Sequence, residues 1–103
     1  MYKLCFYVPE SHLQVVKDAV FNAGAGSIDD YENCCWQVLG EGQFMPNYHA
    51  KPFIGHVNKL TIINEYRVEM VCAADYIEAT AAALKLAHPY EQPAFDIVKV
   101  EQF

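Results

Sequence analysis

The chain has 103 residues and a formal net charge of −6, from 13 acidic and 7 basic side chains. This length predicts one domain over residues 1–103, and a composition that is 53% hydrophobic and 19% charged predicts a folded chain rather than a disordered one. The basic residues are scattered and no two are adjacent. We therefore expect no nucleic acid among the partners, because phosphate binding needs clustered basic charge. No apolar run approaches the roughly 20 residues of a membrane span, so we expect no membrane contact.

The start of the sequence and the cysteines indicate a reducing compartment. Residues 1–4 resemble the start of a strand and not an export signal, so we expect a cytoplasmic location with reduced thiols. Cys34 and Cys35 are adjacent, a spacing that suits neither a common disulfide nor a zinc knuckle. Cys5 and Cys72 fall inside apolar strand patterns, where cysteine packs as a small hydrophobic residue.

The N-terminal part of the chain predicts a strand followed by a helix. Apolar residues alternate with other side chains over 2–8, which is the period of a strand. Ser11 and Gln14 have the spacing of a capping box, and apolar residues then recur at helical spacing over 13–23. The glycines of Gly24–Gly26 allow the left-handed backbone that ends a helix.

A second strand and a long irregular loop follow. Residues 33–39 predict a strand, and the turn residues Gly40–Gly42 predict that 43–45 fold back as a short hairpin arm. Residues 46–58 contain two prolines, a glycine and two aromatic side chains. Irregular segments of this length are uncommon in small domains unless they are functional or cover another surface. This loop is therefore a candidate for function.

The C-terminal half predicts a strand, a helix and a last strand. Residues 60–72 alternate between an apolar face and a charged one. Asp75 and Glu78 form a second capping-box pattern before an apolar stripe over 77–88, and 94–100 predict the last strand. The order β-α-β-β-α-β predicts an α+β fold. It is a ferredoxin-like two-layer sandwich, with both helices on one face of a four-stranded antiparallel sheet and the hairpin arm added.

The sheet face away from the helices is expected to be apolar. That face should be polar if it is open to water, but the predicted strands carry apolar side chains on both faces, among them Cys5, Tyr7, Trp36, Val38 and Val98. A contiguous exposed apolar surface usually marks an interaction site. We therefore expect other copies of the chain to cover this face.

The segment His88-Pro89-Tyr90-Glu91 contains the first candidates for chemistry. An imidazole and a carboxylate three residues apart, as in His88 and Glu91, can share a metal ion or a proton. His88 also ends the apolar stripe of the second helix, where an imidazole can cap the carboxyl end. We favour this structural role for His88 over a catalytic one.

The remaining histidines have no metal-site spacing. His12 opens the first helix, and His49 and His56 lie in the irregular loop. A metal site would therefore have to be assembled by folding or across subunits. Imidazole with carboxylate suits zinc (Zn) or copper (Cu) better than magnesium, and the candidate ligands are His88, Glu91 and His49.

Four separated motifs carry a family resemblance. They are Gly24-Ala25-Gly26, Gly40-Glu41-Gly42-Gln43-Phe44, Pro52-Phe53-Ile54-Gly55 and Ala87-His88-Pro89-Tyr90-Glu91. Together they resemble the domain inserted in the Nif-three-like proteins (NGG-one interacting factor three, often labelled GTP cyclohydrolase type two), over nearly the whole chain. The ending from His88 to Pro93 is also similar to that of the CutA proteins. Both resemblances imply a PII/CutA-like fold, typically a trimer with its sheets facing inward.

The resemblance implies a binding role rather than the chemistry of the family. Full-length Nif-three-like proteins hold a dinuclear metal centre in flanking domains that are absent from these 103 residues, so neither their ligands nor a hydrolase activity is carried over. In CutA-like proteins the matching corner lies near subunit boundaries and is linked to divalent metal. The resemblance therefore points to His88, Tyr90 and Glu91.

The leading hypothesis is a cytoplasmic, non-enzymatic, homo-oligomeric binding or regulatory module, with a trimer favoured. Its ligand, a small molecule or a metal, would bind in clefts between subunits, lined by the 43–56 loop and the 88–91 corner. The alternative is a divalent-metal-binding protein of CutA type. An enzyme with Cys34 or Cys35 as a reactive thiol is the weakest hypothesis. The candidate binding residues are His88, Tyr90, Glu91, Tyr48 and Phe53.

Overall fold

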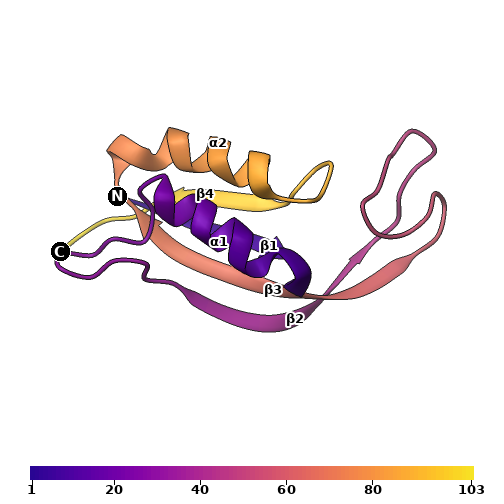
Figure 1. Ribbon diagram of the computed structural model, residues 1–103, viewed down its shortest axis with the longest axis horizontal. Helices are drawn as coiled ribbons and strands as arrows, with labels where there is room; N and C mark the ends of the chain where they lie inside the picture. The colour runs from indigo at the N-terminus through magenta and orange to yellow at the C-terminus, as the bar shows by residue number, and fades with distance from the viewer.

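The computed structural model describes all 103 residues and shows two layers, a four-stranded antiparallel sheet and two helices that cover one of its faces (Figure 1). The strands lie in the order β2-β3-β1-β4. The elements are β1 (Tyr2–Val8), α1 (Leu13–Asn22), β2 (Trp36–Phe44), β3 (Thr61–Cys72), α2 (Ile77–Ala87) and β4 (Phe95–Lys99). This is the ferredoxin-like arrangement predicted from the sequence.

The hydrophobic core lies between the helices and one face of the sheet. Leu4 in β1 stands opposite Met70 in β3 and Ile97 in β4, so alternate residues of the strands point toward the helices. Val16 and Val20 of α1 are fully buried. Burial of each larger core side chain stabilises the fold by about 1.5–3 kcal/mol. The core cluster contains Leu4, Phe6, Val8, Val16, Val20, Ala25, Val68, Met70, Cys72 and Leu84.

Both helices begin with a backbone turn instead of the predicted capping boxes. A short 3-10 turn precedes each helix, in which His12 N–H donates to the Pro9 carbonyl and Tyr76 N–H to the Ala73 carbonyl, each at 3.0 Å. No side chain caps either helix, and Ser11 Oγ bonds to Nδ1 of His12 instead. The prediction of capping boxes is wrong, because the 3-10 turns already occupy the positions directly before the two helices. Neither helix combines the length and apolar character needed to cross a membrane.

β2 is longer than the sequence pattern predicts. The turn predicted at Gly40–Gly42 is wrong, because β2 runs from Trp36 through both glycines to Phe44 and pairs with β3 over nine positions. Neither glycine has the positive φ of a tight turn, and pairing with β3 satisfies backbone hydrogen bonds there. The chain reverses later, between residues 45 and 60. β2 and the start of β3 therefore project beyond the helices as the hairpin arm (Figure 1), and the molecule measures 46 × 24 × 24 Å.

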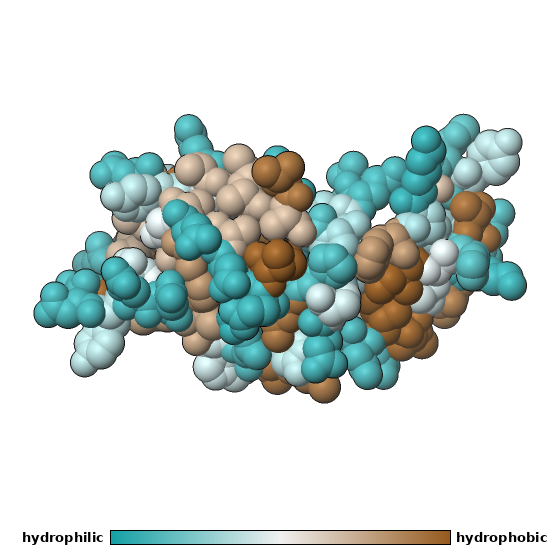
Figure 2. Space-filling view, viewed as in Figure 1, coloured by the Kyte–Doolittle hydropathy of each residue, from teal (hydrophilic) through white to brown (hydrophobic).

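The sheet face opposite the helices is mixed rather than uniformly apolar. It carries exposed Trp36 and Val38, as the sequence predicts. Glu69, however, lies on this face and forms ion pairs with Lys3 at 3.1 Å and with Arg67 at 2.7 Å. Figure 2 shows further hydrophobic surface at the projecting end of the molecule. The exposed apolar side chains of the hairpin arm and its loop include Met45, Val57, Leu60 and Ile62.

Replacing Gly24 with alanine is expected to destabilise the protein. Gly24 follows α1 with a φ of +117°, and a Cβ there would lie 2.5 Å from Cγ of Tyr76, so alanine strains the backbone and displaces the ring. Urea denaturation should show a loss of about 1–3 kcal/mol. Gly40→Ala is the matched control, because a Cβ there meets only the Glu65 carbonyl oxygen, at 4.0 Å. An equal loss in both variants would contradict the geometry at Gly24.

Candidate ligand-binding pocket

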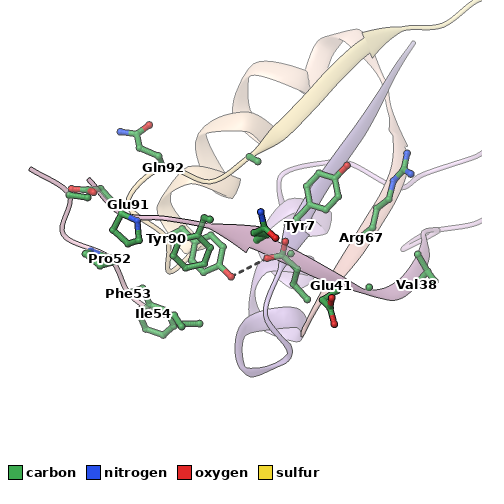
Figure 3. A pocket seen from close by; sticks show the side chains of 18 residues that line it. Tyr7, Val38, Glu41, Pro52, Phe53, Ile54, Arg67, Tyr90, Glu91 and Gln92 are labelled. Carbon is green, nitrogen blue, oxygen red and sulfur yellow. Dashed lines mark hydrogen bonds between the residues drawn. The ribbon is translucent and has the colours of Figure 1, made fainter. Parts of the chain in front are cut away.

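A pocket of about 630 Å³ opens on the sheet face away from the helices, beside the hairpin arm. Its floor belongs to β2 and β3, and its walls are the loop over 46–54 and the corner over 90–94 between α2 and β4. The two walls meet where the Lys51 backbone N–H donates to Glu91, at 3.1 Å. Figure 3 shows Phe53 on one side of Tyr90 and Tyr7 on the other. The volume is that of a small-molecule site.

The floor of the pocket depends on two glycines in β2. Val38, Gly40, Gly42 and Phe44 occupy alternate positions, so they share one face of the strand. A Cβ at Gly42 would overlap the carboxylate of Glu65, which lies over it from β3, whereas the space above Gly40 is open. The two glycines therefore leave room for the Glu65 side chain and for a ligand beside it.

Tyr90 holds Glu65 in place and forms part of an aromatic wall. Its hydroxyl donates to Oε2 of Glu65 at 3.1 Å, and its ring centroid lies 6.4 Å from that of Phe44 and 6.5 Å from that of Phe53. Burial raises the pKa of Tyr90 well above its usual value, and the nearby Glu65 carboxylate raises it further. The phenol therefore stays protonated at neutral pH and remains a donor to Glu65.

His88 supports the pocket from behind and does not line it. Its buried imidazole donates from Nε2 to the Tyr7 carbonyl oxygen at 2.7 Å and accepts the Tyr90 backbone N–H at Nδ1, at 3.1 Å. Only the neutral tautomer with its proton on Nε2 makes both bonds. Burial lowers the pKa of His88, the Tyr7 carbonyl opposes this effect, and the nearby His12 adds to it. His88 thus ties Tyr90 to β1.

The end of the pocket on β1 is polar. Tyr7 and Arg67 stand opposite each other on β1 and β3, and Nε of Arg67 donates to Sγ of Cys5 at 3.3 Å. The neighbouring Cys5 sulfur raises the pKa of Tyr7, so its hydroxyl stays protonated at neutral pH. A ligand that reaches this end meets a phenol and a guanidinium group.

Negative charge dominates the lining of the pocket. Three lining residues carry carboxylates, Glu41, Glu65 and Glu91, and only Arg67 carries a positive charge. Arg67 is already paired with Glu69 at 2.7 Å, while none of the three lining carboxylates forms an ion pair. The pocket therefore contains negative charge without a counterion.

The structure brings together part of the predicted binding set. Phe53, Tyr90 and Glu91 line the pocket, and His88 lies directly behind it, with its ring centroid 4.7 Å from that of Tyr90. Tyr48 lies outside the pocket and is 79% exposed. The predicted loop and corner therefore meet, although Tyr48 points elsewhere.

The candidate metal ligands do not form a cluster within one chain. No three His, Cys, Asp or Glu side chains lie close enough to hold an ion, and both ring nitrogens of His88 already bond to the protein. Glu91 accepts the Lys51 N–H, and the His49 ring packs edge-on against Tyr48, with 4.9 Å between centroids. Zinc or copper binding by His88, Glu91 and His49 stays a prediction, and it would need ligands from a second copy.

Sequence reasoning missed the floor of the pocket. The sequence pattern places Glu65 and Arg67 on a charged strand face and Gly40–Gly42 in a turn. The available signal is glycine at alternate positions of a strand, opposite an acidic residue of its partner strand. That signal can be recognised only once the register of β2 against β3 is known, because the register places Gly40 opposite Glu65.

The fold is that of the PII-like CutA proteins. The PII-like protein CutA from Nostoc matches with a TM-score of 0.69 and 16% identity, over 98% of this chain and 82% of that one. The periplasmic divalent cation tolerance protein CutA from Archaeoglobus fulgidus gives 0.70 and 11%, over 100% and 87%. At these identities the likeness establishes the fold alone. No protein-family profile matches the chain.

The chain is homologous to one part of the Nif-three-like proteins. The GTP cyclohydrolase 1 type 2 homologs of Mycobacterium leprae and Bacillus subtilis are 48% and 43% identical over 92% and 97% of this chain, but over only 25% and 27% of their own lengths. A Bacillus cereus protein related to NIF3 superposes with a TM-score of 0.84 at 30% identity, over 98% of this chain and 26% of that one. The predicted resemblance is confirmed, and the chain spans about a quarter of these relatives.

The pH dependence of stability tests the role of His88. Because the pKa of His88 is lowered in the folded protein, the unfolded chain takes up the proton more readily, and stability falls as pH drops below the ordinary value of 6.5. His88→Gln keeps a donor for the Tyr7 carbonyl but cannot be protonated. Urea midpoints of this variant should therefore fall less than those of the wild type on acidification. His56→Gln, in the exposed loop, should retain the wild-type slope, and a wild-type slope in His88→Gln would contradict the assignment.

The bond between Tyr90 and Glu65 is tested by removing one hydroxyl. Tyr90→Phe should lower the free energy of unfolding by about 1 kcal/mol, because Glu65 loses its side-chain donor. Tyr48→Phe removes the same group from a side chain that is 79% exposed, and it should have no measurable effect. Both values can be taken from guanidinium denaturation followed by Trp36 fluorescence. Equal effects of the two variants would rule out a contribution from the bond.

Proposed function

We propose that this chain is a non-enzymatic, homo-oligomeric binding or regulatory module of the Nif-three-like and CutA-like class, with its ligand held in the pocket beside β2. A trimer and a cytoplasmic location complete the proposal. The observation that carries it is the pocket, where the loop over 46–54 and the corner over 90–94 meet on one face of the sheet. Cavities of this size bind small molecules, and loops placed by a rigid scaffold commonly supply the contacts.

Exposed apolar side chains on the hairpin arm and at the start of β2 support self-association. Leu60 and Ile62 on the hairpin arm are 59% and 56% exposed, and Trp36 at the start of β2 is 61% exposed. β2 is also an edge strand, so the backbone groups along its outer side have no strand partner. An unpaired edge next to apolar side chains is a surface that a second copy would cover.

Self-association would also enclose the pocket. Val38, Gly40, Gly42 and Phe44 place the pocket floor on the edge strand that also carries the exposed Trp36. A copy packed along β2 would therefore stand beside the pocket and turn it into a cleft between subunits. Such clefts are favoured positions for ligands.

Sedimentation velocity tests the proposed assembly. The wild-type chain should sediment as an oligomer at micromolar concentration without added metal. Ile62→Lys places a charge within the apolar surface of the hairpin arm and should shift the protein toward monomer, because burying an unpaired charge is unfavourable. Leu86→Lys is the matched control, since Leu86 lies on α2 and is 90% exposed. A monomeric wild type, or equal dissociation in both variants, would refute the proposal.

A further inference from the structure

We propose that the pocket recognises an organic ammonium ion, meaning an amine cation carried on an apolar or aromatic body. This inference rests on the proposed function, because it names the ligand class of the same pocket. Three properties of the lining support it: a carboxylate without a counterion, a group of converging aromatic rings, and open space over one glycine of β2.

The first property is the charge of Glu65. This half-buried carboxylate accepts the Tyr90 hydroxyl and has no basic partner. Arg67 is the lining cation, but it is paired with Glu69 at 2.7 Å. An anionic ligand would therefore meet a guanidinium group that already has a counterion, whereas a cation would meet a carboxylate that has none. Charge complementarity favours the cation.

The second property is the aromatic wall beside that carboxylate. The ring centroid of Tyr90 lies 6.4 Å from that of Phe44 and 6.5 Å from that of Phe53, and its plane is tilted by 48° and 44° against theirs. Tilted rings leave parts of their faces unstacked. A cation within about 6 Å of a ring centroid is attracted by the negative face of the ring. Aromatic rings beside a carboxylate are the chemistry that binds ammonium groups.

The third property is the space above Gly40. Glycine weakens a strand interior, because it lacks a side chain to pack and loses more backbone entropy. At Gly42 the chain itself requires a glycine, since a Cβ there would overlap Glu65. At Gly40 nothing in the chain requires a glycine. A Cβ added there would meet only the Glu65 carbonyl oxygen, at 4.0 Å, and the φ of Gly40 is not positive. A side chain at this position would stand in the pocket, so the glycine keeps the ligand space open.

An ammonium group could reach the pocket from two sources, a free amine or a lysine of a second copy. Both would present the same kind of cation to Glu65. The chain can supply the second source, because it carries lysines although its net charge is −6. The two sources differ in their effect on assembly. A free probe that displaces a lysine of a second copy weakens self-association, whereas a probe that fills an empty pocket does not weaken it.

The test is an NMR titration of the ¹⁵N-labelled full chain with three probes that share a phenyl ring on a CH₂ group. Benzyltrimethylammonium carries the cation, benzyl alcohol is neutral and phenylacetate is anionic. We expect the cation to bind about tenfold or more tightly than the other two probes, with amide shifts concentrated at Gly40 and Gly42. Sedimentation with and without the cation then identifies the source, and either result supports ammonium recognition.

Two variants locate the recognition. Glu65→Gln keeps an acceptor for the Tyr90 hydroxyl but removes the charge, so the preference for the cation should be lost. Glu78→Gln is the matched control, because it changes the net charge equally at an exposed position of α2. Gly40→Val fills the space above the floor with a residue that favours strands. It should retain the wild-type spectrum elsewhere and bind none of the probes.

The outcomes separate this inference from the proposed function. Equal binding of all three probes at Gly40 would overturn ammonium recognition and leave the pocket as a ligand site. Failure of the cation to bind, or an equal loss of preference in Glu65→Gln and Glu78→Gln, would also overturn it. The oligomeric state of the chain is measured independently, so a monomer that still prefers the cation would support the inference while refuting the proposed assembly.

Discussion

The hydrogen-bonded series from Tyr7 through His88 and Tyr90 to Glu65 is the interaction on which the pocket depends. It links a carbonyl of β1 to an imidazole at the end of α2, then to the backbone and hydroxyl of Tyr90, and finally to a carboxylate of β3. No buried side-chain nitrogen or oxygen lacks a partner. Because unpaired polar groups are unfavourable where water is excluded, the series fixes the corner over 90–94 against the sheet and gives the pocket a defined wall.

The glycines of β2 place function and stability in opposition. A strand gains stability from side chains that pack across to the next strand, and β2 gives up two such positions on one face. At Gly42 the space is used by the Glu65 side chain, so the loss is offset within the chain. At Gly40 nothing in the chain uses the space. The open position is explained when the surface is completed from outside, by a ligand or by a second copy.

The order of elements could be predicted from the sequence because it follows from periodicity. Apolar residues alternate along β1 and β3 and so predict which face of each strand is buried. Helical spacing predicts in the same way that Val16 and Val20 of α1 are buried. The predicted capping boxes and the predicted turn at Gly40–Gly42 are wrong, because they depend on local preferences instead of periodicity. Ser11 and the two glycines have local preferences that the 3-10 turns and the pairing with β3 override. The walls of the pocket could be predicted because they are loops rich in turn residues. Its floor could not, because it depends on the register between β2 and β3.

The proposed ammonium ligand would link ligand binding to assembly through charge. Every copy carries a net charge of −6, and like-charged copies repel when they pack together. Glu65 adds to that repulsion from β3, directly beside the edge strand β2 that we propose as the subunit edge. An ammonium ion bound beside Glu65 would remove part of the repulsion, so a ligand that fills the pocket without displacing a neighbour would favour the oligomer. By thermodynamic reciprocity, the oligomer would then bind the cation more tightly than the monomer, and the pocket would act as a regulatory site.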